Sequence, residues 1–231
     1  MPAQELQLRV ERLDGEELVL DGLGLATAFF GTEADESSFD ALAGTGNPDR
    51  IELADVVTMN RTARARSPHR AWAGLIDAEA PWLAALDPGL DLIEAGAARW
   101  ASIDGDELVA AALRATIGPG RGMAVATKLL HLKRPRLFPM LDRFVAELLG
   151  AGLADSGGEE ARAATAAALM RTIRREGRRN LKELRGIQAR LAKDGRKLSL
   201  VRIFDAVLWS AHPAAGLTGL RRTLSAGLRH D

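Results

Sequence analysis

Residues 118–150 contain the strongest candidates for chemistry, because glycines, basic residues and one aspartate are closely spaced there. The glycine-rich turn contains Gly118, Gly120, Arg121 and Gly122. Glycines let the chain turn tightly and bring backbone N–H groups close to an anion. A helix beginning near Met123 would add the positive end of its dipole. The stretch therefore predicts either a phosphate-binding hairpin or an ordinary turn between two helices.

Asp142 precedes the apolar segment FVAELLG and admits three interpretations. Aspartate is a preferred N-cap residue, because its side chain accepts hydrogen bonds from the free N–H groups of the first helical turn. Asp142 could instead form a buried ion pair with Lys128, Arg134 or Arg136. The third interpretation is a catalytic or ligand-binding role. The flanking residues do not separate these interpretations, since a helix start suits a cap and a catalyst equally.

Two clusters of basic residues could contact a polyanion. The first lies in the connector KRPRLFP, residues 133–139, where two prolines limit the freedom of the chain. The second lies in residues 171–185, where Arg171, Arg174, Arg175 and Arg178 share one helical face. Arginine can bind phosphate through two hydrogen bonds, although a solvated loop is the more frequent outcome for such a connector. The charge of the second cluster would be offset by a DNA or RNA backbone or by the acidic N-terminal half of the chain. The residues predicted to contact nucleic acid are Gly118, Gly120, Arg121, Gly122, Lys128, Lys133, Arg134, Arg136, Arg171, Arg175 and Arg178.

The charge of the chain is unevenly distributed, although the formal net charge is zero. Residues 1–117 contain 9 Lys and Arg against 21 Asp and Glu, whereas residues 118–231 contain 22 against 10. Such an asymmetry indicates either a polyanion partner for the basic half or an acidic partner protein. It is also explained if the two halves of this chain face each other.

Several classes of function are excluded by composition. The chain has no cysteine, so thiolate metal sites, disulfides and cysteine nucleophiles are absent. Its four histidines have no metal-ligand spacing, and no nucleotide-binding fingerprint occurs, so we expect neither a metal nor a cofactor. The polar N-terminus and the short apolar runs predict a soluble cytoplasmic protein with no membrane partner.

The elements that would position these residues are mainly helical. Residues 5–20 alternate apolar and polar positions around Asp14-Gly15, which predicts a β-hairpin. Short helices are expected around residues 39–42 and 50–60, the second with Leu53 on its buried side. The sequence then predicts three more helices: a long one after residue 158, a second after residue 180 and a buried one at residues 198–211. In the last, Asp205 is expected to pair with Arg202. We predict an N-terminal extension at 1–21 and a single helical domain at 22–231.

One resemblance covers most of residues 20–212. The segment GRGMAVATKLLHLKRPRLFPMLDRFV, residues 120–145, is similar to the pattern G-x-G-x-x-x-A-x-K-L-L-x-x-K-R-P-x-L-x-P-x-x-D-x-x-V of an uncharacterised, largely actinobacterial family. The segments FDALAGTGNPDRIELADVVTMN and LSLVRIFDAVLW resemble the same family. This resemblance implies no established activity.

A more distant resemblance is to the core of the helix–hairpin–helix DNA glycosylases. Their G-x-G hairpin would correspond to residues 120–122, and their catalytic aspartate to Asp142. The resemblance implies binding of the DNA backbone and a carboxylate that stabilises positive charge on the sugar and orients the attacking water. The lysine of the lyase-type members would fall at Ala124, so Schiff-base chemistry is not expected.

The sequence therefore predicts a mainly α fold: a helix–hairpin–helix glycosylase-like helical domain with an N-terminal β-hairpin. The functional hypothesis is binding of double-stranded DNA, extended to monofunctional base excision if Asp142 is catalytic. The alternative is a non-enzymatic protein-interaction or regulatory module in which Asp142 is structural and the basic half binds an acidic partner.

Overall fold

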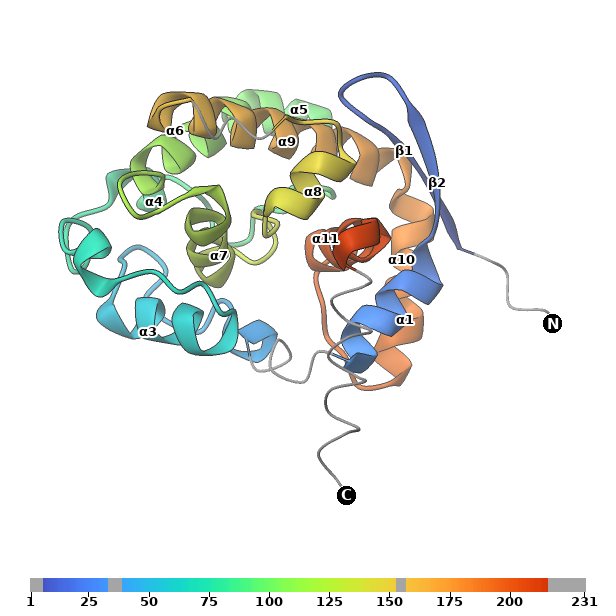
Figure 1. Cartoon of the computed structure of the whole chain (residues 1–231), viewed down its shortest axis with the longest axis horizontal. Helices are drawn as coiled ribbons and strands as arrows, with labels where there is room; N and C mark the ends of the chain where they lie inside the picture. Colours follow the sequence, from blue (N-terminus) through green and yellow to red (C-terminus); the bar gives the residue numbers. More distant parts are fainter. Residues whose placement is uncertain (1–5, 33–38, 153–156, 216–231) are drawn as a thin grey trace.

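The chain forms a mainly helical structure with one small sheet, seen in a computed structural model that describes residues 6–32, 39–152 and 157–215 (Figure 1). The elements are β1 (Gln7–Glu11), β2 (Glu17–Asp21), α1 (Gly22–Thr32), α3 (Leu53–Thr62), the 3-10 helix η1 (His69–Trp72), α4 (Pro81–Ala84), α5 (Ala97–Ser102), α6 (Gly105–Thr116), α7 (Met123–Lys133), α8 (Arg143–Leu148), α9 (Glu159–Arg179), α10 (Leu181–Lys193) and α11 (Leu200–Ala211). Parts of the predicted extension and domain, residues 1–5 and 216–231, lie outside the described residues. The division at residue 22 remains a prediction.

The predicted N-terminal β-hairpin is confirmed. Strands β1 and β2 pair antiparallel, with Leu8 opposite Leu20 and Val10 opposite Leu18, so the apolar residues share one face. Gly15 has a φ of +84° at the turn, a conformation that glycine adopts without a steric cost. The alternation seen in the sequence therefore determines both the register and the buried face of this sheet.

Helix α9 supports the hairpin, which would not be stable alone. Asn180 bonds both backbone groups of Arg9: its Oδ1 accepts from the Arg9 N–H at 2.9 Å, and its Nδ2 donates to the Arg9 carbonyl at 2.7 Å. Glu176 Oε2 accepts from the Glu11 N–H at 3.0 Å. These two side chains, four residues apart, bond the outer edge of β1 as a third strand would, which satisfies its backbone and blocks further strand pairing.

Helix α11 is central to the part of the chain that the structure describes (Figure 1). It contacts α1, α8, α9 and α10, and residues 200–208 are all buried. The expected pairing of Asp205 with Arg202 is confirmed, with 2.9 Å between Oδ2 and Nη1. Burial of the pair is tolerated because Arg202 also bonds Asp40, and removal of Arg202 would leave two buried carboxylates without this partner.

One packing prediction was wrong. Leu53 was expected on the buried side of its helix, but it is 49% exposed. Helix α3 begins at Leu53, and Ile51 instead forms an isolated β-bridge with Ile76 before the helix starts. Extending helical periodicity backwards through Ile51 therefore placed Leu53 on the wrong face.

Candidate functional site

Asp142 acts as the N-cap of α8. Its Oδ1 accepts hydrogen bonds from the backbone N–H groups of Phe144, at 2.9 Å, and Val145, at 3.1 Å. Its Oδ2 accepts from Trp209 Nε1 at 2.9 Å, which joins α8 to α11. The capping interpretation of Asp142 is thus observed directly, and a catalytic role would have to coexist with these three bonds.

The carboxyl group of Asp142 lies in an environment that favours its neutral form. Burial raises its pKa above the ordinary value, while the hydrogen bonds from Val145 and Trp209 and the charge of Lys128 oppose that effect. A cavity of about 40 Å³ borders the carboxyl group. This space suits ordered water but is too small for a nucleobase. Its walls are Phe29, Lys128, Met140, Asp142, Arg202, Asp205 and Trp209.

The glycine-rich turn connects α6 and α7 as a hairpin. Gly118 and Arg121 form an isolated antiparallel bridge, with Arg121 N–H donating to the Gly118 carbonyl at 2.8 Å. Gly120 has a φ of +71°, which requires glycine or a strained residue. Helix α7 begins at Met123, as the sequence predicted. The arrangement is a helix, a hairpin and a helix.

The N-terminus of α7 presents unbonded donors. Gly122 is the N-cap residue and supplies no side chain to bond the first turn. Within the described residues, the N–H groups of Gly122, Met123 and Ala124 have no hydrogen-bond acceptor. Such groups, together with the helix dipole, attract anions. The Leu141 N–H bonds Thr127 Oγ1 at 2.9 Å, so the segment leading to Asp142 lies beside α7.

Three of the predicted phosphate-binding cations are instead used inside the protein. Arg121 donates to the carbonyls of Thr116 and Ala71 and lies over the Trp72 ring. Lys133 is buried and pairs with Asp55. Because these charges have internal partners, they hold the fold together and are not available to an external phosphate.

Arg134 is the most complete example of this internal use, since it is only 1% exposed. Its guanidinium donates to the carbonyls of Leu86, at 2.8 Å, Leu83, at 2.8 Å, and Pro48, at 2.6 Å. It also pairs with Asp49 at 3.0 Å. One side chain therefore joins the end of α7 to two segments from the first hundred residues.

Other predicted cations are partly or fully exposed. Arg136 pairs with Asp91 and Glu94, and Lys128 Nζ donates to the Ala63 carbonyl at 2.7 Å. On α9, Arg178 donates to the carbonyls of Ile93 and Ala95, and Arg175 to Glu176 and to the Glu11 carbonyl. Arg171 is exposed. Of these residues, Lys128 bonds a segment that packs against the hairpin, whereas Arg136, Arg175 and Arg178 bond other parts of the chain.

A different basic segment, residues 61–71, lies against the hairpin. Ser67 Oγ donates to the Gly120 carbonyl at 3.2 Å, and Trp72 Nε1 donates to Ser67 Oγ at 2.8 Å. The segment is anchored further by Arg121 and Lys128, which bond its carbonyls. Its arginines are exposed: Arg61, Arg64, Arg66 and Arg70. We call residues 61–71 the arginine loop.

The arginine loop is conformationally unusual. Arg64 and Arg66 adopt left-handed backbone conformations, with φ of 50° and 52°. Each costs about 1 kcal/mol or more for a residue with a Cβ atom, and such strain concentrates at functional sites. The sequence signal for this segment is the run RTARARSPHR, whose four arginines lie within a strongly acidic half and are hidden in its summed charge.

The fold and the site define a mainly α-helical protein with a tight glycine-rich turn between α6 and α7 and an arginine loop beside it. The chain belongs to a family of unknown function (DUF6308), whose family model matches residues 24–212. No curated protein and no solved structure matches this chain. In the described part of the chain, no helix has the length and apolar character needed to span a membrane.

Proposed function

We propose that this protein binds the backbone of double-stranded DNA at the surface formed by residues 118–124 and the arginine loop. The observation that supports this most strongly is the packing of an exposed, strained arginine segment directly against a hairpin with free backbone donors. Neither element alone would carry the proposal, because turns and surface arginines are common. Together they supply the two kinds of group that bind phosphates.

The contacts would be of two types. The N–H groups of Gly122, Met123 and Ala124 would bond one phosphate, helped by the α7 dipole. The exposed arginines would contact neighbouring phosphates on the same strand. Contacts of this kind hold the DNA in position without selecting a sequence. We therefore expect similar affinity for duplexes of unrelated sequence.

The test is the salt dependence of duplex binding. The triple variant Arg61→Ala, Arg66→Ala and Arg70→Ala removes three exposed charges, and each phosphate contact contributes about 0.9 to the slope of log K against log salt. We expect the slope to fall by about 2 to 3. Lys182→Ala and Arg190→Ala, exposed sites on α10, serve as the control and should leave it unchanged.

Absent or salt-independent binding by the native protein would refute the proposal. Equal slopes for the native protein and the triple variant would refute this surface. If duplex binding is absent while an acidic partner protein is bound through the same arginines, the alternative of a protein-interaction module is favoured.

Base excision is a second candidate function, favoured by the buried carboxyl group of Asp142 beside Lys128. In that function, Asp142 would stabilise positive charge on the sugar and orient a water held in the adjoining cavity. Because Ala124 occupies the lysine position, the base would leave by hydrolysis rather than through a Schiff base. The 40 Å³ cavity would have to open to admit a base.

This second candidate is tested with duplexes that carry damaged bases. Formation of abasic sites by the native protein, and its loss in Asp142→Asn while that variant remains folded at the assay temperature, would support catalysis. Asparagine retains the N-cap acceptor, so the cap itself is preserved. If no abasic sites form, Asp142 is a cap and the protein is a binding module.

A further inference from the structure

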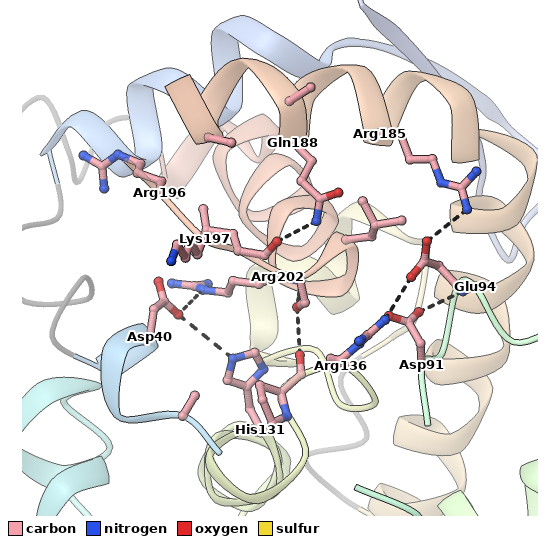
Figure 2. Close-up of a pocket in the computed structure, with 17 residues that line it drawn as sticks. Asp40, Asp91, Glu94, His131, Arg136, Arg185, Gln188, Arg196, Lys197 and Arg202 are labelled. Atoms are coloured by element: carbon pink, nitrogen blue, oxygen red, sulfur yellow. Dashed lines mark hydrogen bonds and ion pairs between the residues drawn. The ribbon is translucent and has the colours of Figure 1, made fainter. Parts of the chain in front are cut away.

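A cavity of about 600 Å³ lies at the opposite end of α7 from the hairpin (Figure 2). Its walls come from the helical residues 39–42, the end of α7, α10 and the start of α11. A cavity of this volume is in the range that holds a small organic molecule. Nothing in the proposed DNA-binding surface uses it.

The residues that line this cavity include more cations than carboxylates. Five cations face three carboxylates: Arg136, Arg185, Arg196, Lys197 and Arg202 against Asp40, Asp91 and Glu94. The carboxylates are already paired, since Asp91 and Glu94 bond Arg136 at 3.1 and 3.0 Å, and Asp40 bonds Arg202 at 2.7 Å. Arg185 also pairs with Glu94. The lining residues therefore include two more cations than carboxylates, and Arg202 has a further carboxylate partner, Asp205, outside the lining.

Arg196 and Lys197 carry that excess. Within the described ranges of the chain, neither side chain has an acidic partner. Arg196 is half-buried, and its guanidinium lies 5.8 Å from the centre of the Phe30 ring. The two cations are adjacent in the chain and both line the cavity, so both are candidates to bind an anionic group there.

Asp40 provides an independent indication of a ligand. Its side chain is 10% exposed, and Oδ1 accepts from Arg202 and lies 4.0 Å from His131 Nε2. Its Oδ2 is buried and has no hydrogen-bond partner among the described residues. An unbonded buried carboxylate oxygen is costly, so such atoms in native proteins usually have a partner. A hydroxyl or amino group of a ligand would supply the missing donor.

We propose that this cavity binds a small phosphate monoester whose organic part carries hydroxyl or amino donors. The phosphate would lie at Arg196 and Lys197, and a donor of the organic part would bond Asp40 Oδ2. A phosphate monoester carries a charge of about −1.5 to −2 at neutral pH, which matches the excess of the lining. The charge-assisted bonds would provide most of the affinity, and Asp40 would select the organic part.

The proposal is tested by calorimetry and thermal shift with ribose 5-phosphate, adenosine 5′-monophosphate and inorganic phosphate. Ribose and adenosine are the unphosphorylated controls. At least one ester should bind the native protein and raise its melting temperature, whereas its unphosphorylated counterpart should not. The double variant Arg196→Ala, Lys197→Ala should weaken ester binding about tenfold or more. Lys182→Ala, an exposed cation outside this cavity, should have no effect.

Asp40→Asn tests the contact to the organic part of the ligand separately from the contacts to its phosphate. It should weaken ester binding about tenfold without weakening the binding of inorganic phosphate, because the substitution removes a donor's acceptor and also a negative charge. Failure of both esters to bind, or equal binding to the native protein and the double variant, would overturn the proposal. Because the probes are not duplexes and the residues lie away from the hairpin, this result is independent of DNA binding.

Discussion

The link between Asp142 and Trp209 can be measured by removing its two partners separately and together. Asp142→Ala deletes the α8 cap, which is worth about 1 kcal/mol, and leaves the Trp209 N–H without an acceptor, at a cost of about 1 to 3 kcal/mol. Deleting the buried carboxylate returns part of its desolvation cost. We therefore expect the free energy of unfolding to fall by about 2 kcal/mol.

In the Trp209→Phe background, the contribution of the Asp142 cap to the free energy of unfolding can be measured alone. Phenylalanine has no N–H to satisfy but can still pack against Phe29 and Phe144, whose rings lie 5.5 and 6.0 Å from that of Trp209. In this background Asp142→Ala should cost only about 1 kcal/mol, the value of the cap. The difference between the two backgrounds, about 1 kcal/mol, is the coupling between the side chains.

Urea denaturation followed by circular dichroism is the appropriate assay, because helix content reports unfolding in all four proteins. Asp142→Asn is the matched comparison, since asparagine retains the cap but places an NH2 group against the Trp209 N–H and so loses only that bond. Equal costs of Asp142→Ala in both backgrounds would show that the bond to Trp209 contributes nothing. A cost below about 0.5 kcal/mol in both would refute the assignment of Asp142 as a stabilising cap.

Three further outcomes follow from the buried charges. Because burial raises the pKa of Asp142 above 3.8, the folded state holds its proton to higher pH than the unfolded state. The free energy of unfolding of the native protein, relative to Asp142→Asn, should therefore be highest below pH 3.8 and fall as pH rises through the raised pKa. Urea titrations that show the opposite slope would contradict this expectation. Lys133→Met leaves Asp55 buried without its partner, so it should cost about 3 to 5 kcal/mol, whereas adding Asp55→Leu should recover most of that loss in the same assay. Arg134→Lys should lower the free energy of unfolding by at least about 2 kcal/mol, because one ammonium group cannot make the several bonds of the planar guanidinium to the surrounding carbonyls. An unchanged melting temperature would contradict the structural role of Arg134.

The local features of this protein could be predicted from its sequence. The alternation around Asp14-Gly15 determined the hairpin and its register, and the apolar spacing determined the long helices α9, α10 and α11. The start of α7 at Met123 and the pairing of Arg202 with Asp205 were also correct. These features depend on residues within a few positions of one another, where backbone geometry and side-chain period decide the outcome.

For most charged side chains, whether they are buried, paired or exposed was decided only by the tertiary structure. Lys133 and Arg134 lie in a short basic connector that the sequence suggests is solvated. Their partners are nevertheless distant in the chain: Asp55 lies 78 positions before Lys133, and Pro48 and Leu86 lie 86 and 48 positions before Arg134. A cation becomes structural when folding places carbonyls or a carboxylate around it, and no local pattern encodes those distant atoms.

Long-range packing also explains why the positions of the arginine loop and of the cavity could not be predicted from the sequence. The arginine loop became part of the candidate DNA surface because Ser67 bonds Gly120, a contact between residues 53 positions apart. Lys197 became part of a cavity because α10 and α11 meet the end of α7 there. Composition and period therefore determined which helices form, whereas long-range packing decided which charges are buried, which are paired and which remain available to a ligand.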